Sequence, residues 1–165
     1  DTILFLTSAL NGAPDKEHRL TISTLLAYEH EAHNNFGAAE ALLKQCVEEV
    51  PEDSTFRIAL AAHFKRRQKF DEALVWVQSA MTPERVKTGS LRFVHTEQIE
   101  VAVKAGRRDL VEASLKVLID EPRRSNEQPL ASFFLPELEQ MGVDEELLTR
   151  YRALVAEERS STVVR

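Results

Sequence analysis

The side chains best suited to metal chemistry are two histidines, His30 and His33, which stand beside the carboxylates of Glu29 and Glu31. Residues three apart lie on one face of a helix, so the two imidazoles could bind a single metal ion. Zinc sites in proteins use at least three protein ligands, however, and this pair has no clear third ligand. His30 stands at the position of Phe64 in the second repeat. We therefore expect a packed ring at His30, no metal site and no cofactor.

Nucleophilic catalysis needs a reactive group with a base beside it, and the sequence offers none in a recognisable arrangement. Its single cysteine, Cys46, stands 34 residues before Ala80 in an equivalent position, which predicts a buried structural thiol. The sequence also lacks a Gly-rich phosphate loop, a nucleophile elbow and a Cys/His cluster with zinc spacing. We predict that the protein is not an enzyme.

Because one cysteine gives no sign of an oxidising compartment, we expect a cytoplasmic location.

The most prominent charged feature is a cluster of four cations, Lys65, Arg66, Arg67 and Lys69. Cations at the end of a helix complement its dipole by about 0.3–1 kcal/mol, and a binding role is the alternative explanation. The chain as a whole carries a formal charge of −6 and has a pI near 5.4, which disfavours a general nucleic-acid binder. No apolar run reaches the ~20 residues that a membrane span needs.

The elements that must position these residues repeat along the chain. Phe36-Gly-Ala-Ala39 and Phe70-Asp-Glu-Ala73 place an aromatic residue and an alanine at the same spacing, 34 residues apart. A fixed period of this length is typical of helical repeat proteins, and the two-residue alternation of strands is missing, so we predict an all-α chain. About nine helices are expected, near residues 2–11, 16–33, 36–49, 54–67, 70–81, 91–105, 108–120 and 130–141, with a last one after Asp144.

The repeat resembles the tetratricopeptide repeat family, whose unit of 34 residues is a helix-turn-helix. The first two units match at Leu26, Ala27, Phe36, Ala39, Leu43, Cys46 and Pro51, and at Leu60, Ala61, Phe64, Phe70, Ala73, Val77 and Ala80. The third matches at Gly106, Leu110, Ala113 and Val117, with two extra residues between Gly106 and Leu110. The resemblance implies a right-handed α-solenoid, in which the first helix of each repeat lines a concave groove. Small residues such as Ala39 and Ala73 should be buried where two helices cross.

We divide the chain into a repeat array over residues 1–121, a degenerate repeat with capping helices over 122–158, and a tail over 159–165. The array is expected to start in mid-repeat, because the apolar, small and proline positions of a second helix recur there as Phe5, Leu6, Ala9 and Pro14. Such a helix lacks its partner helix and leaves apolar residues exposed. Self-association through the N-terminal helix, or folding back of that helix, is therefore expected.

We predict a protein-interaction scaffold that binds a peptide or a helix of a partner protein in its groove. By the resemblance, the groove is lined by Tyr28, Ile58, Ala62, Lys65, Arg66, Phe93, Thr96, Glu100 and Lys104. The cations of this set stand beside apolar residues, so an acidic and partly apolar partner segment is expected. A helical spacer, or a regulatory or sensor domain of a longer multidomain protein, is the alternative. The sequence does not name the partner.

Overall fold

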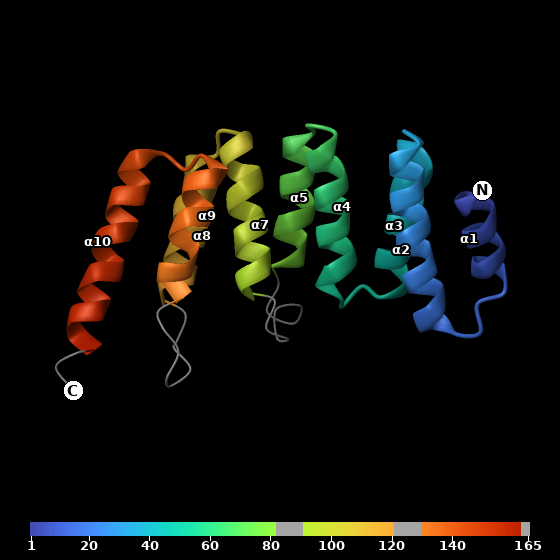
Figure 1. The fold of residues 1–165 in the computed structure, drawn as a ribbon, viewed down its shortest axis with the longest axis horizontal. Coiled ribbons are helices and arrows are strands. Elements are labelled where there is room, and N and C mark those ends of the chain that lie inside the picture. Colours follow the sequence, from blue (N-terminus) through green and yellow to red (C-terminus); the bar gives the residue numbers. More distant parts are fainter. Residues whose placement is uncertain (82–90, 121–129, 163–165) are drawn as a thin grey trace. The chain divides into compact units, whose positions relative to one another are not determined.

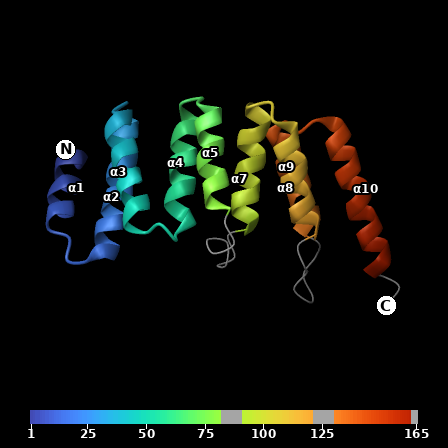
Figure 2. The ribbon, with the colours of Figure 1, turned by 180° about the vertical axis from the view of Figure 1, so that it is seen from behind.

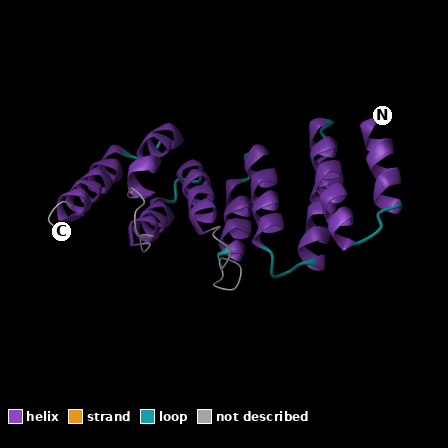
Figure 3. Cartoon of the chain, turned by 60° about the horizontal axis from the view of Figure 1, so that its bottom comes forward, coloured by secondary structure: helices purple, strands orange, loops and turns teal. Residues whose placement is uncertain are grey.

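The computed structural model describes residues 1–81, 91–120 and 130–162, and this part of the chain consists of helices joined by loops and turns (Figure 3). The predicted all-α fold class is thereby confirmed. The nine helices in the described ranges are α1 (Thr2–Asn11), α2 (Lys16–Ala32), α3 (Phe36–Glu49), α4 (Ser54–Arg66), α5 (Phe70–Ala80), α7 (Leu91–Lys104), α8 (Arg108–Asp120), α9 (Leu130–Met141) and α10 (Glu145–Thr162).

The predicted helix boundaries agree with the observed ones to within a residue, except at the end of the chain. Side chains that precede each helix explain several of these starts. Asp15 and Asp53 accept hydrogen bonds from backbone N–H groups in the first turns of α2 and α4, and Asp144 accepts one from Leu147 N at 3.0 Å. Helix α10 continues to Thr162, into the residues that we predicted to be a tail.

The chain divides into two compact units, residues 1–87 and 88–165. In the first unit α2 pairs with α3 and α4 pairs with α5, while α1 lies against α2 (Figure 1). In the second unit α7 pairs with α8, and the hairpin of α9 and α10 packs on them (Figure 2). The predicted boundary near residue 121 and the links 82–90 and 121–129 lie outside the described residues.

Every helical hairpin turns through the same backbone motif. In the first, Asn34 has a φ of 60°, its N–H donates to the Glu31 carbonyl at 2.9 Å, and the Asn35 N–H donates to the His30 carbonyl at 2.8 Å. These two bonds define a Schellman turn, which ends one helix and redirects the chain into the next. The same two bonds recur around the positive-φ residues Gln68, Gly106 and Gly142.

These turns correct the predicted register of the third repeat. The position five residues after the turn residue is held by Ala39 in α3, Ala73 in α5 and Val111 in α8. All three residues are buried. Ala113, which we had assigned to this position, is exposed instead. The prediction was wrong because Leu110-Val-Glu-Ala113 imitates the spacing of Phe70-Asp-Glu-Ala73, although the buried position also accepts valine. The turn therefore contains no extra residues.

The C-terminal hairpin has the same spacing of buried residues after its turn residue. Leu147 and Tyr151 lie five and nine residues after Gly142, where Ala39 and Leu43 lie after Asn34, and both are buried. Tyr151 is 1% exposed and is among the largest fully buried side chains of the described residues. Helices α9 and α10 thus form a repeat of the array's kind, which the irregular sequence between residues 122 and 141 conceals.

Small residues let the helices of the first unit approach one another closely. Ala27, Ala39, Ala61 and Ala73 are all fully buried, as the repeat pattern predicted. Next to this core, Leu6 of α1 is buried as well, whereas its neighbours Leu4 and Phe5 are 69% and 72% exposed. Helix α1 therefore has one covered face and one apolar face that the described residues leave open.

Helices α7 and α8 share a buried polar cluster in the second unit. His95 Nδ1 lies 3.0 Å from Ser114 Oγ, and the Ser114 hydroxyl donates to Gln98 Oε1 at 2.7 Å. Because that hydroxyl has a single proton, it must accept from Nδ1–H, so the His95 ring carries a proton on Nδ1. Burial lowers the pKa of His95 below its ordinary value of 6.5.

We expect protonation of His95 to lower the stability of the protein as the pH is lowered from about 7 toward 5. The unfolded chain takes up the proton near pH 6.5 and the folded chain only at lower pH, so protonation favours unfolding in that window. His95→Asn keeps an N–H donor for Ser114 but cannot titrate. Urea midpoints at about pH 7 and about pH 5.5 should differ more for the parent than for His95→Asn. Equal differences would contradict this role of His95.

Candidate functional site

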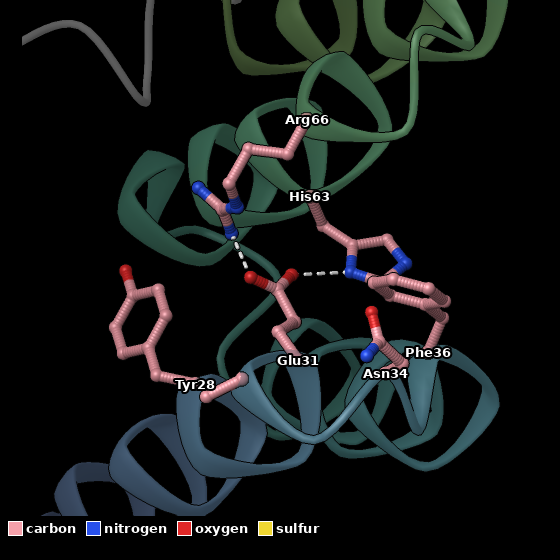
Figure 4. Close-up of a pocket in the computed structure, with 7 residues that line it drawn as sticks. Tyr28, Glu31, Asn34, Phe36, His63 and Arg66 are labelled. Carbon is pink, nitrogen blue, oxygen red and sulfur yellow. Dashed lines mark hydrogen bonds and ion pairs between the residues drawn. The ribbon is translucent and has the colours of Figure 1, made fainter.

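An open hollow of about 460 Å³ lies in the first unit, between the ends of α2 and α4 and the start of α3 (Figure 4). Helix α3 packs against both α2 and α4, and the turn at Asn34 brings its first residue close to the end of α2. The hollow is lined by Tyr28, Glu31 and Ala32 from α2, Asn34 from the turn, Phe36 from α3, and His63 and Arg66 from α4.

Glu31 lies at the centre of the polar contacts in this hollow. Its Oε1 accepts a hydrogen bond from His63 Nδ1, and its Oε2 pairs with Arg66 Nη2 at 2.5 Å. The Glu31 side chain is only 11% exposed, and these contacts satisfy both of its oxygens. Because Glu31 belongs to the first repeat and its two partners to the second, these contacts join the two repeats.

His63 is fully buried and has a partner at each ring nitrogen. Its Nδ1 contacts Glu31 Oε1, and its Nε2 lies 3.4 Å from Arg67 Nη1 and 3.9 Å from Glu40 Oε2. The rings of Phe36 and Phe64 stand edge-on to the imidazole, with centroids 6.4 Å and 5.2 Å away. The imidazole is therefore held in one orientation, with Nδ1 directed at Glu31.

Two aromatic rings form the apolar sides of the hollow. Tyr28 stands on one side of Glu31, and Phe36 stands on the other side beside His63 (Figure 4). The Arg66 guanidinium carbon lies 5.7 Å from the centre of the Tyr28 ring, within the range of a cation–π contact. About 45% of the Arg66 side chain stays exposed, so the hollow combines aromatic walls with an accessible cation.

The cations of the basic cluster take part in contacts within the fold. Arg67 pairs with Glu40 at 3.5 Å and lies over Phe36, and Lys69 pairs with Glu72 at 3.4 Å. Glu40 also accepts a hydrogen bond from Lys44, which is the main reason that its pKa lies below the ordinary value. Arg66 and Arg67 thus link the second repeat to carboxylates of the first, a role beyond that of complementing a helix dipole.

The structure brings two of the predicted groove residues, Tyr28 and Arg66, into one hollow. Ile58 is buried and adds little surface, while Ala62 and Lys65 are partly exposed. The remaining predicted residues belong to the second unit and are described by themselves. There Phe93 is exposed, Thr96 is partly exposed, and Lys104 Nζ lies 3.9 Å from Glu100 Oε1.

Sequence reasoning overlooked His63. No local signal marks its role, because its partner Glu31 is 32 residues away and the equivalent position of the first repeat holds Glu29. A lone histidine next to apolar residues gives no sign of such a contact. The helices α2 and α4 each had to be placed against α3 before the hydrogen bond could be identified.

His30 lies in the last turn of α2, and His33 is the C-cap residue of that helix. His33 Nδ1 lies 2.8 Å from the Glu29 carbonyl oxygen, and His30 Nδ1 lies 3.4 Å from Asn35 Nδ2. Within the described residues no group of three or more His, Cys, Asp or Glu side chains is placed to hold a metal ion. Cys46 is buried, and desolvation, the largest cause, raises the pKa of its thiol to about 11, which makes it unreactive.

A smaller hollow of about 150 Å³ lies in the second unit, between the turns of its two hairpins. Arg108 at its edge pairs with Asp144 at 3.3 Å and with Glu146 at 2.8 Å. Arg108 occupies the position of Phe36 and Phe70, two residues after the turn residue, so an ionic contact stands here where the first two repeats have an aromatic ring. We regard it as a structural junction.

Comparison with known proteins supports the fold. No protein-family model and no curated protein matches the sequence. The solved structure named MamA MSR-1 C2, a tetratricopeptide-repeat protein, is similar with a TM-score of 0.51 and 19% sequence identity, over 96% of this chain and 93% of that chain. This likeness shows a helical repeat fold of the tetratricopeptide type. None of the helices in the described residues is long and apolar enough to cross a membrane.

Proposed function

We propose that the protein is an interaction scaffold, and that the hollow between α2, α3 and α4 docks a segment of a partner protein. The observation that supports this most directly is the meeting of Tyr28 and Arg66 in one accessible hollow. The partner segment would carry an apolar residue next to an acidic one. The apolar side chain would lie against Tyr28 and Phe36, and the acidic side chain would reach Arg66.

The two contacts contribute unequally. Burying an apolar side chain such as leucine or phenylalanine is worth about 1.5–3 kcal/mol, whereas an exposed ion pair is worth about 0.2–1 kcal/mol. The aromatic walls would therefore supply most of the affinity, and Arg66 would select for the sign of the partner's charge.

The cytoplasmic location that we expect from the single cysteine remains a prediction.

A library of displayed random peptides, selected on the immobilised chain, tests this proposal. Enriched peptides should combine apolar and acidic residues and should bind Tyr28→Ala and Arg66→Glu about tenfold more weakly than the parent. Val75→Ala and Lys44→Glu are the matched controls, because Val75 is exposed on α5 and Lys44 is a cation paired with a glutamate, and neither lines the hollow.

Enriched peptides that bind all four variants alike would show that the hollow is not the docking site. Failure to enrich any peptide would instead favour the alternative, a helical spacer or sensor domain of a longer protein. Circular dichroism of each variant would confirm that its helices remain intact.

We also propose that α1 mediates self-association, because Leu4 and Phe5 are both largely exposed on one short helix. Replacing both by serine should shift the sedimentation profile of the parent toward the monomer. Serine at Val75 and Val117, which are exposed on α5 and α8, should leave the profile unchanged. A parent that stays monomeric over the whole concentration range would refute the proposal.

A further inference from the structure

We infer that Glu31 is a built-in competitor for the acidic side chain of the partner, and that it sets how strongly the hollow discriminates between acidic and neutral segments. The inference rests on the proposed docking role of the hollow. It concerns a different residue from those that bind the partner, and it predicts a gain of affinity when that residue is changed.

The competition follows from where Glu31 lies. Its Oε2 is 2.5 Å from Arg66 Nη2, and Arg66 is the cation that a partner's carboxylate would meet in the hollow. A guanidinium has five N–H donors, so a second carboxylate can still bind to the exposed part of Arg66. The two carboxylates would then share one cation, and their mutual repulsion would offset part of the attraction.

Glu31 cannot easily move aside. Its other oxygen is bonded to Nδ1 of His63, a fully buried ring that is held from its other side by Arg67. The second repeat thus fixes the carboxylate in the position where it competes. A neutral segment does not meet this competition, because it uses the aromatic walls and leaves the ion pair between Glu31 and Arg66 intact.

The chain contains a matched control. Glu40 is also a partly buried glutamate on a first-repeat helix, and it pairs with Arg67 at 3.5 Å and with Lys44 at 2.7 Å, but it does not line the hollow. Glu31→Gln and Glu40→Gln each remove one negative charge and one contact to an arginine. Only the first should change the hollow. The glutamine in Glu31→Gln can still accept the hydrogen bond from His63 through its carbonyl oxygen.

Two blocked dipeptides, acetylated and amidated Phe-Glu and Phe-Gln, are the probes, because they differ only in one charge. Binding would be followed by nuclear magnetic resonance through the backbone amides of Asn34 and Phe36 in the isotope-labelled chain. Glu31→Gln should bind Phe-Glu about two- to fivefold more tightly than the parent does, and the gain should shrink at high salt. The affinity for Phe-Gln should not change, and Glu40→Gln should behave like the parent with both probes.

Each other outcome overturns the inference. Unchanged or weaker binding of Phe-Glu to Glu31→Gln would mean that Glu31 orients Arg66 for the partner. Equal tightening of both dipeptides would indicate a change of shape. A gain that persists when Arg66→Gln is added would show that Arg66 is not the shared cation. If neither dipeptide shifts the two amides in the parent or in Glu31→Gln, the docking role of the hollow is refuted as well.

Discussion

Tyr151→Ala is expected to lower the free energy of unfolding by about 3–5 kcal/mol, the range found when a large buried aromatic side chain is removed. Tyr151 is 1% exposed and lies at the position of α10 that Leu43 occupies in α3. The loss reflects both the missing apolar contacts and the cavity that remains. Urea unfolding followed by circular dichroism measures it.

Tyr28→Ala is the control for this prediction, because Tyr28 is exposed and the same atoms are deleted. Its effect should stay within about 0.5 kcal/mol of zero, apart from the loss of its contact with Arg66. If Tyr151→Ala were as stable as the parent, α10 would not be part of the core of the second unit. The C-terminal hairpin would then be an appendage and no repeat of the array.

Ala73→Leu is expected to cost about 1–3 kcal/mol, because Ala73 is fully buried where α5 crosses α4 and three added carbons have no space. The fluorescence of Trp76, on the same helix, would follow unfolding in urea. Ala113→Leu is the matched control. The repeated spacing assigned Ala113 to the same position, but the structure exposes it on α8.

The Ala113→Leu variant should therefore change the stability by no more than about 0.5 kcal/mol. The Ala113 variant decides between the two registers of the third repeat, since both registers bury Ala73. A loss at Ala113 as large as the one at Ala73 would mean that the sequence register is right and that the structural one is wrong.

Local patterns in the sequence were sufficient for the helices. The start of α2 follows from Asp15, which caps its first turn, and the ends of α2 and α4 follow from polar turn residues. The repeat pattern then identified the buried positions Ala39 and Ala73. These features depend on residues within about one or two turns of each other, and a sequence displays such relations directly.

The register of α8 could not be obtained in this way. Leu110-Val-Glu-Ala113 satisfies the spacing of the repeat as well as the true register does, and only the turn at Gly106 distinguishes them. The turn residue has a positive φ, but Asn34 and Gln68 hold the same conformation without being glycine, so no common residue marks the position.

The sequence by itself thus determined an all-α chain of helical hairpins, most of their boundaries and much of the small-residue core of the first unit. The tertiary structure alone decided which side chains meet in the hollow. Glu31 and His63 are 32 residues apart, and their contact depends on how α2 and α4 each pack against α3. Burial makes that contact strong, because a carboxylate with little water around it needs donors from the neighbouring repeat.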